Sequence, residues 1–327
     1  MDGLCELNWR RGEAAQALQW GRKSLDAKHT LALQNGDVQP TEMAKRYANV
    51  ASDLKVIGFS LFGHEAFYAE AAVRNAQDVA QHYPDWVCRF YVGPEVSSAI
   101  KLRLHQAGAE VVSPPQAQAH LPGTVWRFLA IDDLRVSTVM MRDADSLITN
   151  REVAAVQQWL DSGKSFHVIR DHAMHTELML AGLWGARTQQ LRGIGQALLT
   201  FFAKPFHPTH ADQHFLRDWV WPRVWSDVVQ HDAVLNWHAQ GMHAPIGLVQ
   251  DQQEHIGHAP TQWTHLDAPP ALSNAMQIRY QLWNESAQVL GEFVAARQSG
   301  GFSIRLPPHV LEKVQAGQWQ LKALLEP

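Results

Sequence analysis

The sequence is poor in cysteine and in charge. Cys5 and Cys88 are the two cysteines among 327 residues, and they form no Cys-x-x-Cys pair, zinc-ligand spacing or disulfide framework. A disulfide between them stays open, but a reducing cytoplasm is the simpler interpretation and predicts a cytoplasmic protein. Charged residues make up 18% and the net charge is −4. Because no block of like charges is long enough to follow a nucleic-acid backbone, nucleic acid is not expected as a partner.

Long apolar runs are also missing. The most apolar short run, at 197–202, is far too short to cross a bilayer. Residues 1–6 contain no basic start followed by an apolar stretch, which argues against a signal peptide. We therefore expect no transmembrane segment, and any membrane association would be peripheral, at the inner face.

The central part of the chain alternates between apolar runs and helical patterns. Such alternation predicts a mostly parallel sheet flanked by helices, in the α/β class. Strands are expected at 55–61, 86–92, 110–112, 136–141 and 166–170, and helices at 68–82, 96–107, 125–134 and 151–162. After about residue 181 the alternation weakens, and we expect a helical, tryptophan-rich segment over 182–237.

The two ends of the chain show other patterns. The first thirty residues indicate helix, and residues 11–25 resemble part of a tetratricopeptide repeat; an ordinary amphipathic helix explains them equally well. Short runs split by Gly and Pro at 276–283, 289–295, 302–306 and 318–324 predict a small antiparallel β appendage. The expected domains are a helical, repeat-like segment with its linker (1–50), a catalytic domain (51–270) and the β appendage (271–327).

The most informative motif is the Asp-x-Asp of Asp143 and Asp145, directly after an apolar strand. In open α/β sheets, ligands bind beyond the carboxyl ends of the strands. Two carboxylates at this spacing can approach one Mn²⁺ or Mg²⁺ ion and leave coordination sites for phosphate oxygens. The neighbouring Arg142 is a candidate partner for a phosphate or a carboxylate. The alternative for the triplet is a solvated turn.

Several segments resemble a family of bacterial and viral glycosyltransferases of the GT-A type, often found behind tetratricopeptide repeats. They keep their order across roughly residues 55–190. The segments are Phe59-Ser60-Leu61-Phe62-Gly63, Tyr83-Pro84-Asp85-Trp86, Trp126-Arg127-Phe128-Leu129, Arg142-Asp143-Ala144-Asp145-Ser146, Arg151-Glu152, Phe166-His167-Val168-Ile169-Arg170-Asp171-His172 and Gly182-Leu183-Trp184-Gly185.

The resemblance implies a GT-A-like fold, a nucleotide-sugar donor such as a UDP- or GDP-sugar, and a divalent metal. It implies a hydroxyl acceptor on a glycan, a lipid-linked glycan, a protein or a small molecule. Position by position, it places Phe59, Ser60 and Leu61 near the nucleoside, and Trp126 and Arg127 near the sugar diphosphate. Core packing is the alternative for Trp126.

The same resemblance assigns the metal and its neighbours. Asp145 is the best metal ligand, and Asp143 is shared between metal and donor. Many GT-A enzymes complete the metal site with a late histidine, for which His255 and His258 are the candidates. In a chain with 18 histidines, such a pair also arises by chance.

Acceptor and catalytic roles fall on the later motifs. The acceptor-binding candidates are His172, Gly182, Trp184 and Gly185, with residues 182–185 expected as a turn that offers an aromatic face to a sugar. Asp171 is a candidate general base, and an ion pair with Arg142 or Arg170 is its alternative. Asp212 and Gln213 resemble a pair that faces the reaction centre in several GT-A families. For Asp212, a helix N-cap is the competing interpretation.

Departures from the family pattern leave a second hypothesis open. Leu147 replaces an expected basic residue, Ala173 an expected proline, and Ala181 one glycine of a Gly-Gly pair. These changes are compatible with a degenerate, non-catalytic protein that binds a nucleotide or a partner. A metal-dependent phosphohydrolase is a poor third interpretation, because no acidic nucleophile follows the first strand.

Overall fold

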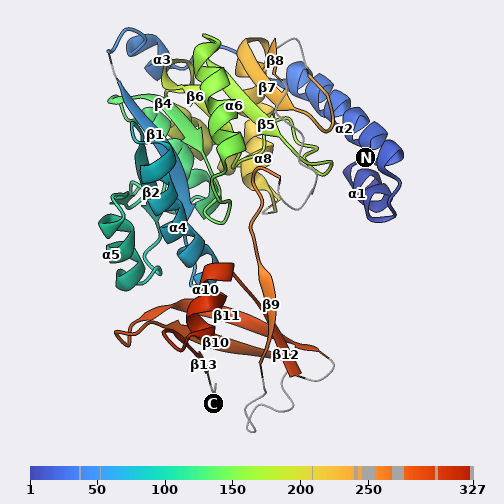
Figure 1. Cartoon of the computed structure of the whole chain (residues 1–327). Helices are drawn as coiled ribbons and strands as arrows, with labels where there is room; N and C mark the ends of the chain where they lie inside the picture. The colour runs from blue at the N-terminus through green and yellow to red at the C-terminus, as the bar shows by residue number, and fades with distance from the viewer. Residues whose placement is uncertain are drawn as a thin grey trace.

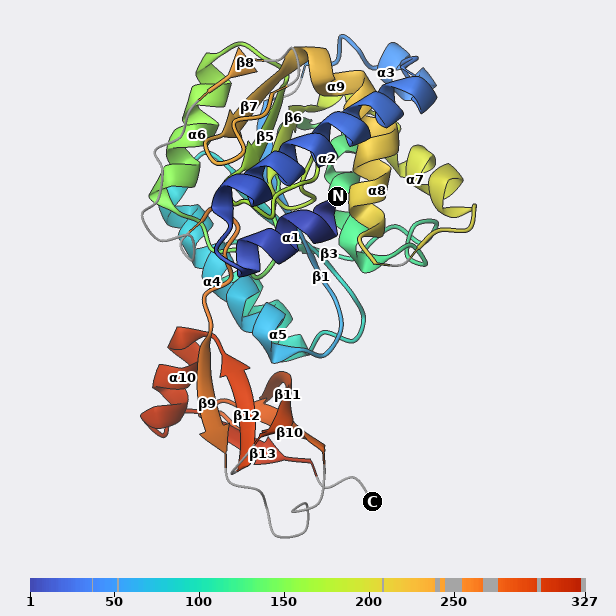
Figure 2. The same ribbon diagram turned by 90° about the vertical axis from the view of Figure 1, so that its right-hand side faces the viewer.

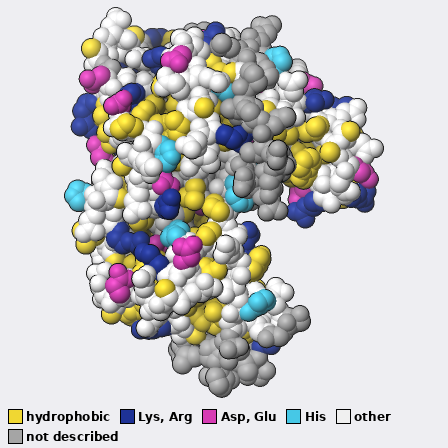
Figure 3. Space-filling view, viewed as in Figure 1, with side chains coloured by type: hydrophobic (Ala, Val, Ile, Leu, Met, Phe, Trp, Pro, Cys, Tyr) yellow, Lys and Arg dark blue, Asp and Glu magenta, His cyan; other side chains and the backbone are white. Residues whose placement is uncertain are grey.

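The computed structural model describes residues 1–36, 38–51, 53–207, 209–238, 242–244, 255–266, 276–298 and 301–324. These residues form two β-sheets, a large one in the upper part of Figure 1 and a small one below it. The space-filling view from the same side shows basic and acidic side chains interspersed on this face (Figure 3). The overall arrangement is therefore a helix-covered sheet with a second sheet attached beneath it.

The large sheet has eight strands in the order β3-β2-β1-β4-β6-β5-β7-β8. All pairings are parallel except those of β6, which runs antiparallel to both of its neighbours. The strands are β1 (Leu54–Leu61), β2 (Val87–Val92), β3 (Glu110–Val112), β4 (Val136–Met141), β5 (Phe166–Arg170), β6 (Trp184–Arg187), β7 (Val228–Asp232) and β8 (Met242–His243). The predicted mostly parallel α/β sheet is confirmed.

Helices cover both faces of this sheet because its strands are apolar on both sides. Along β1, Ile57 and Phe59 face one hydrophobic core, while Val56 faces the other. The first core contains α4 (Ala66–His82), α5 (Ser98–Gln106) and α6 (Asn150–Asp161). The second contains the 3-10 helix η1 (Gly123–Asp132), α7 (Ile194–Phe202), α8 (Ala211–Phe215), the π-helical turn η3 (Leu216–Val220) and α9 (Trp221–Val224). Two 3-10 turns, η2 (Thr188–Leu191) and η4 (Trp225–Asp227), complete this part.

Two expectations about the middle of the chain hold only in part. Gly182 lies in a turn and Leu183 in a bend, but Trp184 and Gly185 already belong to strand β6. The segment 182–237 is not wholly helical, because it contains β6 and β7. Both strands are short and buried between neighbours, so their own sequence carries little alternation.

The N-terminal helices α1 (Asp2–Arg10) and α2 (Ala14–Asn35) pack against the large sheet's second helical layer (Figure 2). Asp26 accepts a hydrogen bond from the Trp237 indole, and Arg22 donates to the Leu235 carbonyl. A short helix, α3 (Glu42–Arg46), lies within the expected linker. Whether α1 and α2 represent a true repeat stays a prediction. The two cysteines are both buried and free, which excludes the disulfide alternative.

The small sheet has the strand order β13-β10-β11-β12-β9 and is antiparallel. Its strands are β9 (Gln262–Leu266), β10 (Gln277–Trp283), β11 (Val289–Gln298), β12 (Gly301–Leu306) and β13 (Gln320–Ala323), with helix α10 (Pro308–Gln315) before the last. The predicted β appendage is confirmed as an antiparallel sheet. Strand β9 belongs to it although it precedes residue 271, the predicted boundary, and the domain limits themselves stay predictions.

The small sheet is joined to the large one by backbone contacts. The Glu292 amide donates to the His64 carbonyl at 2.7 Å, in the turn after β1. Gly291 packs so closely on Ala66 that an added Cβ would lie 2.8 Å from the Ala66 Cα. The apolar side of the sheet continues the first core. None of the described helices combines the length and apolarity that crossing a bilayer requires.

Candidate active site

A cavity of about 610 Å³ opens at the carboxyl ends of β1 and β4, which are neighbours in the sheet. This is the edge at which open α/β sheets bind their ligands. Seven predicted site residues line it: Ser60, Leu61, Arg127, Asp143, Asp145, Asp212 and Gln213. The other lining residues are Phe62, Gly63, His64, Glu65, Tyr68, Thr124, Ala144, His175, Leu180, Ala181, Leu183, His210, Ala211 and Gly257.

The turn that carries the two aspartates is held from three directions. Strand β4 ends at Met141, and the Ser146 amide donates back to the Asp143 carbonyl at 3.2 Å. The Ala144 carbonyl accepts a hydrogen bond from Asn75, a buried residue of α4. The Ser146 hydroxyl donates to the Gly257 carbonyl at 3.0 Å. These bonds fix the turn, so that both aspartate side chains lie at the cavity wall.

Arg127 is a cation of this cavity and is almost fully buried, at 2% exposure. Its guanidinium donates to Asp143 at 2.6 Å and to Asp212 at 3.2 Å. The Arg127 backbone amide donates to the Ser60 hydroxyl of β1 at 3.0 Å. One buried guanidinium thus ties together carboxylates from two separate parts of the chain.

The carboxylates carry more negative charge than Arg127 alone can balance. Burial, followed by the nearby Asp143, raises the pKa of Asp145 to about 6. Burial also raises the pKa of Asp212, although Arg127 opposes the shift. Asp143 and Asp212 share Arg127, whereas Asp145 forms no ion pair with any residue that the structure describes. A cation placed at this wall would therefore be stabilised by the charge already there.

Tyr68 is a site residue that sequence reasoning missed. It lies on the first turn of α4 and its side chain is 39% exposed. Burial raises its hydroxyl pKa, with further contributions from Asp145, Glu65 and Asp143. Tyr68 lines the same cavity as Asp143 and Asp145. Glu65 and His64 also line the cavity from the β1–α4 turn. For His64 and Glu65, the available signal was Gly63, which marks the end of β1 at the ligand-binding edge.

Gly182 supports the aspartate turn from behind. A Cβ at this position would lie 2.1 Å from Oδ2 of Asp143 and 2.8 Å from the Asp143 amide nitrogen. No side chain fits there without displacing the carboxylate. The predicted importance of Gly182 therefore has a different basis from the acceptor contact that the sequence suggests: it leaves room for Asp143.

Four other residues that were predicted to contact ligand lie in the hydrophobic core and do not line the cavity. Trp184, Gly185 and Phe59 are three of them. The Trp184 ring is fully buried and meets Phe128 edge-on at 5.6 Å, so it cannot stack on a sugar. Gly185 packs against the Trp159 ring. Phe59 is fully buried and stacks on Phe90 at 4.6 Å. We therefore withdraw Trp184, Gly185 and Phe59 from the ligand-binding set.

Trp126 is packed in the core, which is the alternative considered for it from the sequence. It is 6% exposed and contacts Phe62 edge-on at 5.9 Å. Phe62 in turn lines the cavity. Trp126 thus supports a cavity residue and does not itself line the cavity.

The two ion-pair expectations for Arg142 and Asp171 are wrong. Arg142 is fully buried and donates to Glu152 of α6 at 2.6 Å. Asp171 is paired with neither Arg142 nor Arg170; Arg151 contacts both of its oxygens, at 2.7 and 2.8 Å. The Ile256 amide adds a third hydrogen bond to Asp171 at 2.8 Å. Because the carboxylate is buried and fully engaged, its geometry does not favour a general base, and Arg142 does not reach the cavity.

The predicted histidines gather beside the cavity and not within a metal site. The rings of His172 and His255 lie 4.7 Å apart, and His255 and His258 lie 5.6 Å apart. His175, which lines the cavity, contacts His255 at 4.9 Å. Burial and His255 lower the pKa of His172 to about 4. His172 also meets the Trp9 ring of α1, so the N-terminal helix covers this cluster.

The four predicted metal ligands do not form one cluster. Within the part of the chain that the structure describes, no three His, Cys, Asp or Glu side chains converge as ligands. The assignment of His255 and His258 as metal ligands stays a prediction. Asp143 and Asp145 still fit a divalent cation, because both carboxylates line the same cavity. The raised pKa of Asp145 shows that its negative charge is poorly balanced there.

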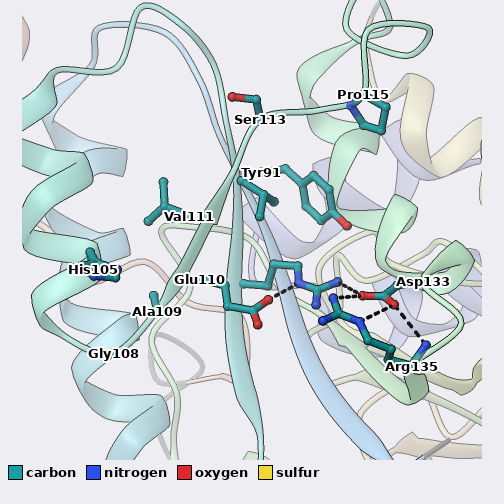
Figure 4. Close-up of a pocket in the computed structure, with 12 residues that line it drawn as sticks. Tyr91, His105, Gly108, Ala109, Glu110, Val111, Ser113, Pro115, Asp133 and Arg135 are labelled. Atoms are coloured by element: carbon teal, nitrogen blue, oxygen red, sulfur yellow. Dashed lines mark hydrogen bonds and ion pairs between the residues drawn. The ribbon is translucent and has the colours of Figure 1, made fainter.

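A second cavity, of about 640 Å³, lies along β3 at the free edge of the sheet (Figure 4). Its buried Arg89 pairs with Glu110 at 2.6 Å and with Asp133 at 3.1 Å. Arg135 also pairs with Asp133, at 2.8 Å. These charges neutralise one another within the wall. The arrangement therefore supports local stability and gives little attraction for a charged ligand.

Comparisons with known proteins give similarity to solved structures only. No protein-family model and no curated protein matches the chain. A glycosyltransferase involved in the glycosylation of the major capsid of PBCV-1 shares 14% identity, covering 55% of this chain and 82% of that one, with a TM-score of 0.36.

Two further solved structures show the same level of similarity. The galactosyltransferase LgtC with donor and acceptor sugar analogues shares 15% identity, over 55% and 74% of the two chains, with a TM-score of 0.37. Glucosyl-3-phosphoglycerate synthase from Mycobacterium tuberculosis, in complex with Mn²⁺, UDP-glucose and phosphoglyceric acid, shares 15% identity over 65% and 79%, with a TM-score of 0.36. Similarity this low assigns no activity to this chain.

Proposed function

We propose that the chain is a glycosyltransferase that moves a sugar from a nucleotide-sugar donor to a hydroxyl acceptor. The supporting observation is the cavity that joins Asp143, Asp145, Arg127 and the Asp212–Gln213 pair at the carboxyl ends of β1 and β4. Acidic side chains, a buried cation and a strand-end position are together what a metal-bound diphosphate requires. The proposal therefore rests on the chain's own geometry.

In this proposal, Asp143 and Asp145 hold a divalent cation, Mn²⁺ or Mg²⁺. When bound, that cation neutralises the charge developing on the departing nucleoside diphosphate. Ser60 and Leu61, at the end of β1, lie where the nucleoside would bind. With a cation held by the carboxylates, part of the Arg127 guanidinium would be free to contact the diphosphate instead of Asp143. Its burial supports the role, because a desolvated guanidinium attracts phosphate strongly.

Asp212 and Gln213 lie where the reacting sugar would be held. The Asp212 carboxylate also accepts a hydrogen bond from the backbone N–H of Gln213 at 3.0 Å. Because burial raises the Asp212 pKa, this carboxylate is a weakly stabilised anion that gains from a nearby hydroxyl or positive charge. We assign it to the sugar side of the cavity and leave Asp171 out of the reaction.

A thermal-shift panel of UDP, GDP and CMP, each with Mn²⁺ or Mg²⁺, tests the proposal. A nucleotide at about one hundred times its Kd should stabilise the protein by about 2.7 kcal/mol. The stabilisation should disappear with EDTA and in Asp145→Asn. Asp161→Asn, an exposed carboxylate on α6, is the matched control and should respond like the parent protein.

Release of the nucleotide (UDP, GDP or CMP) from the matching nucleotide-sugar then distinguishes the two hypotheses for this fold. Metal-dependent release that is lost in Asp145→Asn supports the transferase. Binding without release would assign the chain to the nucleotide-binding alternative. If no nucleotide stabilises the parent protein, or Asp145→Asn responds equally, the proposed site is wrong.

A further inference from the structure

The small sheet has one apolar face and one polar face, which alternate along each strand. On β10, Ile278, Tyr280 and Leu282 are buried, as are Phe302 and Leu306 on β12. These side chains pack in the first core with α4, α5 and α10. The opposite face, which we call the outer face, carries the intervening residues: Arg279, Gln281 and Trp283 of β10, Glu292 and Val294 of β11, Arg305 of β12, Trp263 and His265 of β9, and Lys322 of β13.

The outer face is basic, although the whole chain has a net charge of −4. Among its described residues it carries Arg279, Arg305 and Lys322, but only one carboxylate, Glu292. Glu292 lies 3.8 Å from Arg279, whose side chain is still 50% exposed. This face therefore presents a positive surface on an acidic protein, and such a surface attracts anions.

Each of two tryptophans on this face lies beside one of these cations. Arg305 and Trp263 are direct partners across β12 and β9, with the guanidinium carbon 5.4 Å from the ring centre. Trp263 is 61% exposed, which is unusual for so large an apolar ring. Near the opposite edge of the sheet, on the same face, Lys322 lies 4.2 Å from the Trp283 ring centre. The two aromatic–cation pairs thus stand at opposite ends of the strand order.

We propose that the outer face binds an anionic saccharide chain. Aromatic rings stack on the C–H faces of sugar rings, while arginine and lysine pair with carboxylate, sulfate or phosphate substituents. Gln281 of β10 and His265 of β9 supply further hydrogen-bonding groups on this face. The separation of the pairs by the width of the sheet suits an extended polymer better than a single small anion.

An anionic membrane is the competing occupant, since it also attracts basic and aromatic surfaces. Membrane-binding elements bury several apolar side chains beneath the headgroups. Between the two pairs, the described outer face offers one exposed aliphatic residue, Val294, at 53% exposure. The scarcity of exposed aliphatic side chains between the pairs therefore favours the saccharide.

This face is connected to the cavity by a short stretch of chain, visible in Figure 1 as the connection leading down into β9. Gly257 lines the cavity, and β9 begins five residues later, at Gln262. Five residues span at most about 17 Å when fully extended. A polymer held on the outer face would therefore stay close to the cavity, whatever reaction occurs there. The proposal goes beyond the proposed transferase activity and does not depend on it.

Calorimetric titration with oligogalacturonate, a carboxylate-bearing saccharide, tests the proposal on the full chain. Neutral maltooligosaccharide of matched length and vesicles containing phosphatidylserine are the comparison ligands. Oligogalacturonate should bind and should weaken as salt is added, because exposed charges are screened. Trp263→Ala and Arg305→Ala should each weaken binding by roughly five- to tenfold. Lys322→Ala should weaken it as well, and it provides an independent variant at the far end of the face.

Phe206→Ala and Arg135→Ala are the matched controls, because both side chains are exposed but lie outside this sheet. Both should bind oligogalacturonate like the parent protein. Asp145→Asn should also bind it, so that loss of nucleotide binding and loss of saccharide binding are separable results. The proposal is overturned if the parent protein does not bind oligogalacturonate, if the outer-face variants bind as well as the controls, or if only the vesicles bind.

Discussion

Replacing Gly182 by alanine is the sharpest perturbation of the candidate site. The added methyl group would lie 2.1 Å from Oδ2 and 2.4 Å from Cγ of Asp143. It would also lie 2.8 Å from the Asp143 backbone nitrogen, which cannot rotate away as a side chain can. Asp143 must therefore leave its 2.6 Å contact with Arg127, and the turn itself must shift.

The expected cost combines two effects. Overpacking of a tight contact costs about 1–3 kcal/mol, and a weakened hydrogen bond between charged groups adds about 1 kcal/mol. Asp143 is 46% exposed, so we take the lower part of the range for its ion pair. Gly182→Ala should therefore destabilise the protein by about 2–4 kcal/mol. Gly182→Ala should weaken metal-dependent nucleotide binding more than does a substitution far from the cavity that destabilises the protein equally.

Urea unfolding measures the first effect, and the thermal-shift panel with nucleotide and Mn²⁺ measures the second. Gly3→Ala is the control, because its added Cβ meets no atom within 4 Å and it lies in helix α1. That variant should be neutral or slightly stabilised, by about 0.5–1 kcal/mol. If Gly182→Ala matches Gly3→Ala in both assays, the close contact behind Asp143 does not shape the site.

Three further variants test the surroundings. Glu152→Ala leaves the buried Arg142 without its partner and should cost about 3–5 kcal/mol in urea unfolding; a change near zero would contradict a structural role for the pair. Hydrogen bonds from Arg135 lower the pKa of Asp133 from 3.8 to about 2. The ionised Asp133 carboxylate therefore stabilises the folded protein above pH 3.8, and this contribution is lost as the pH falls through about 2. Asp133→Asn should therefore cost about 1 kcal/mol at neutral pH and little in strong acid, and an equal cost at both pH values would refute the assignment. Gly291→Ala places a methyl group 2.8 Å from the Ala66 Cα and should increase proteolysis at the junction of the two sheets; an unchanged digestion pattern would show that the junction tolerates it.

The aspartate corner could be predicted because strand position and residue chemistry agree there. An apolar run that ends in two spaced carboxylates is typical of a ligand-binding strand end in an α/β sheet, and the structure brings both carboxylates to one cavity. Arg127, Ser60 and Leu61 were predicted from the resemblance to GT-A glycosyltransferases, and all three line the same cavity. The mostly parallel sheet followed from the alternation of strand and helix patterns.

The error at Trp184 originates in β6. This strand inserts antiparallel between β4 and β5, a pairing that no local pattern reveals. It moves Trp184 from an expected turn into the core. The partner of Arg142 was equally hidden, because Glu152 is ten residues away on a helix that covers the sheet. The cavity-lining Tyr68 was missed because an exposed tyrosine on a helix has no sequence pattern that separates it from ordinary surface residues.

The backbone bond from Glu292 to His64 makes the two sheets thermodynamically dependent on each other. His64 lines the cavity, while Glu292 belongs to the outer face, so one peptide contact borders two proposed binding surfaces. A ligand that tightens the β1–α4 turn would also tighten β11, and linkage requires the reverse effect to be equal in free energy. Through this contact, a ligand on the small sheet would be linked to the β1–α4 turn that borders the cavity.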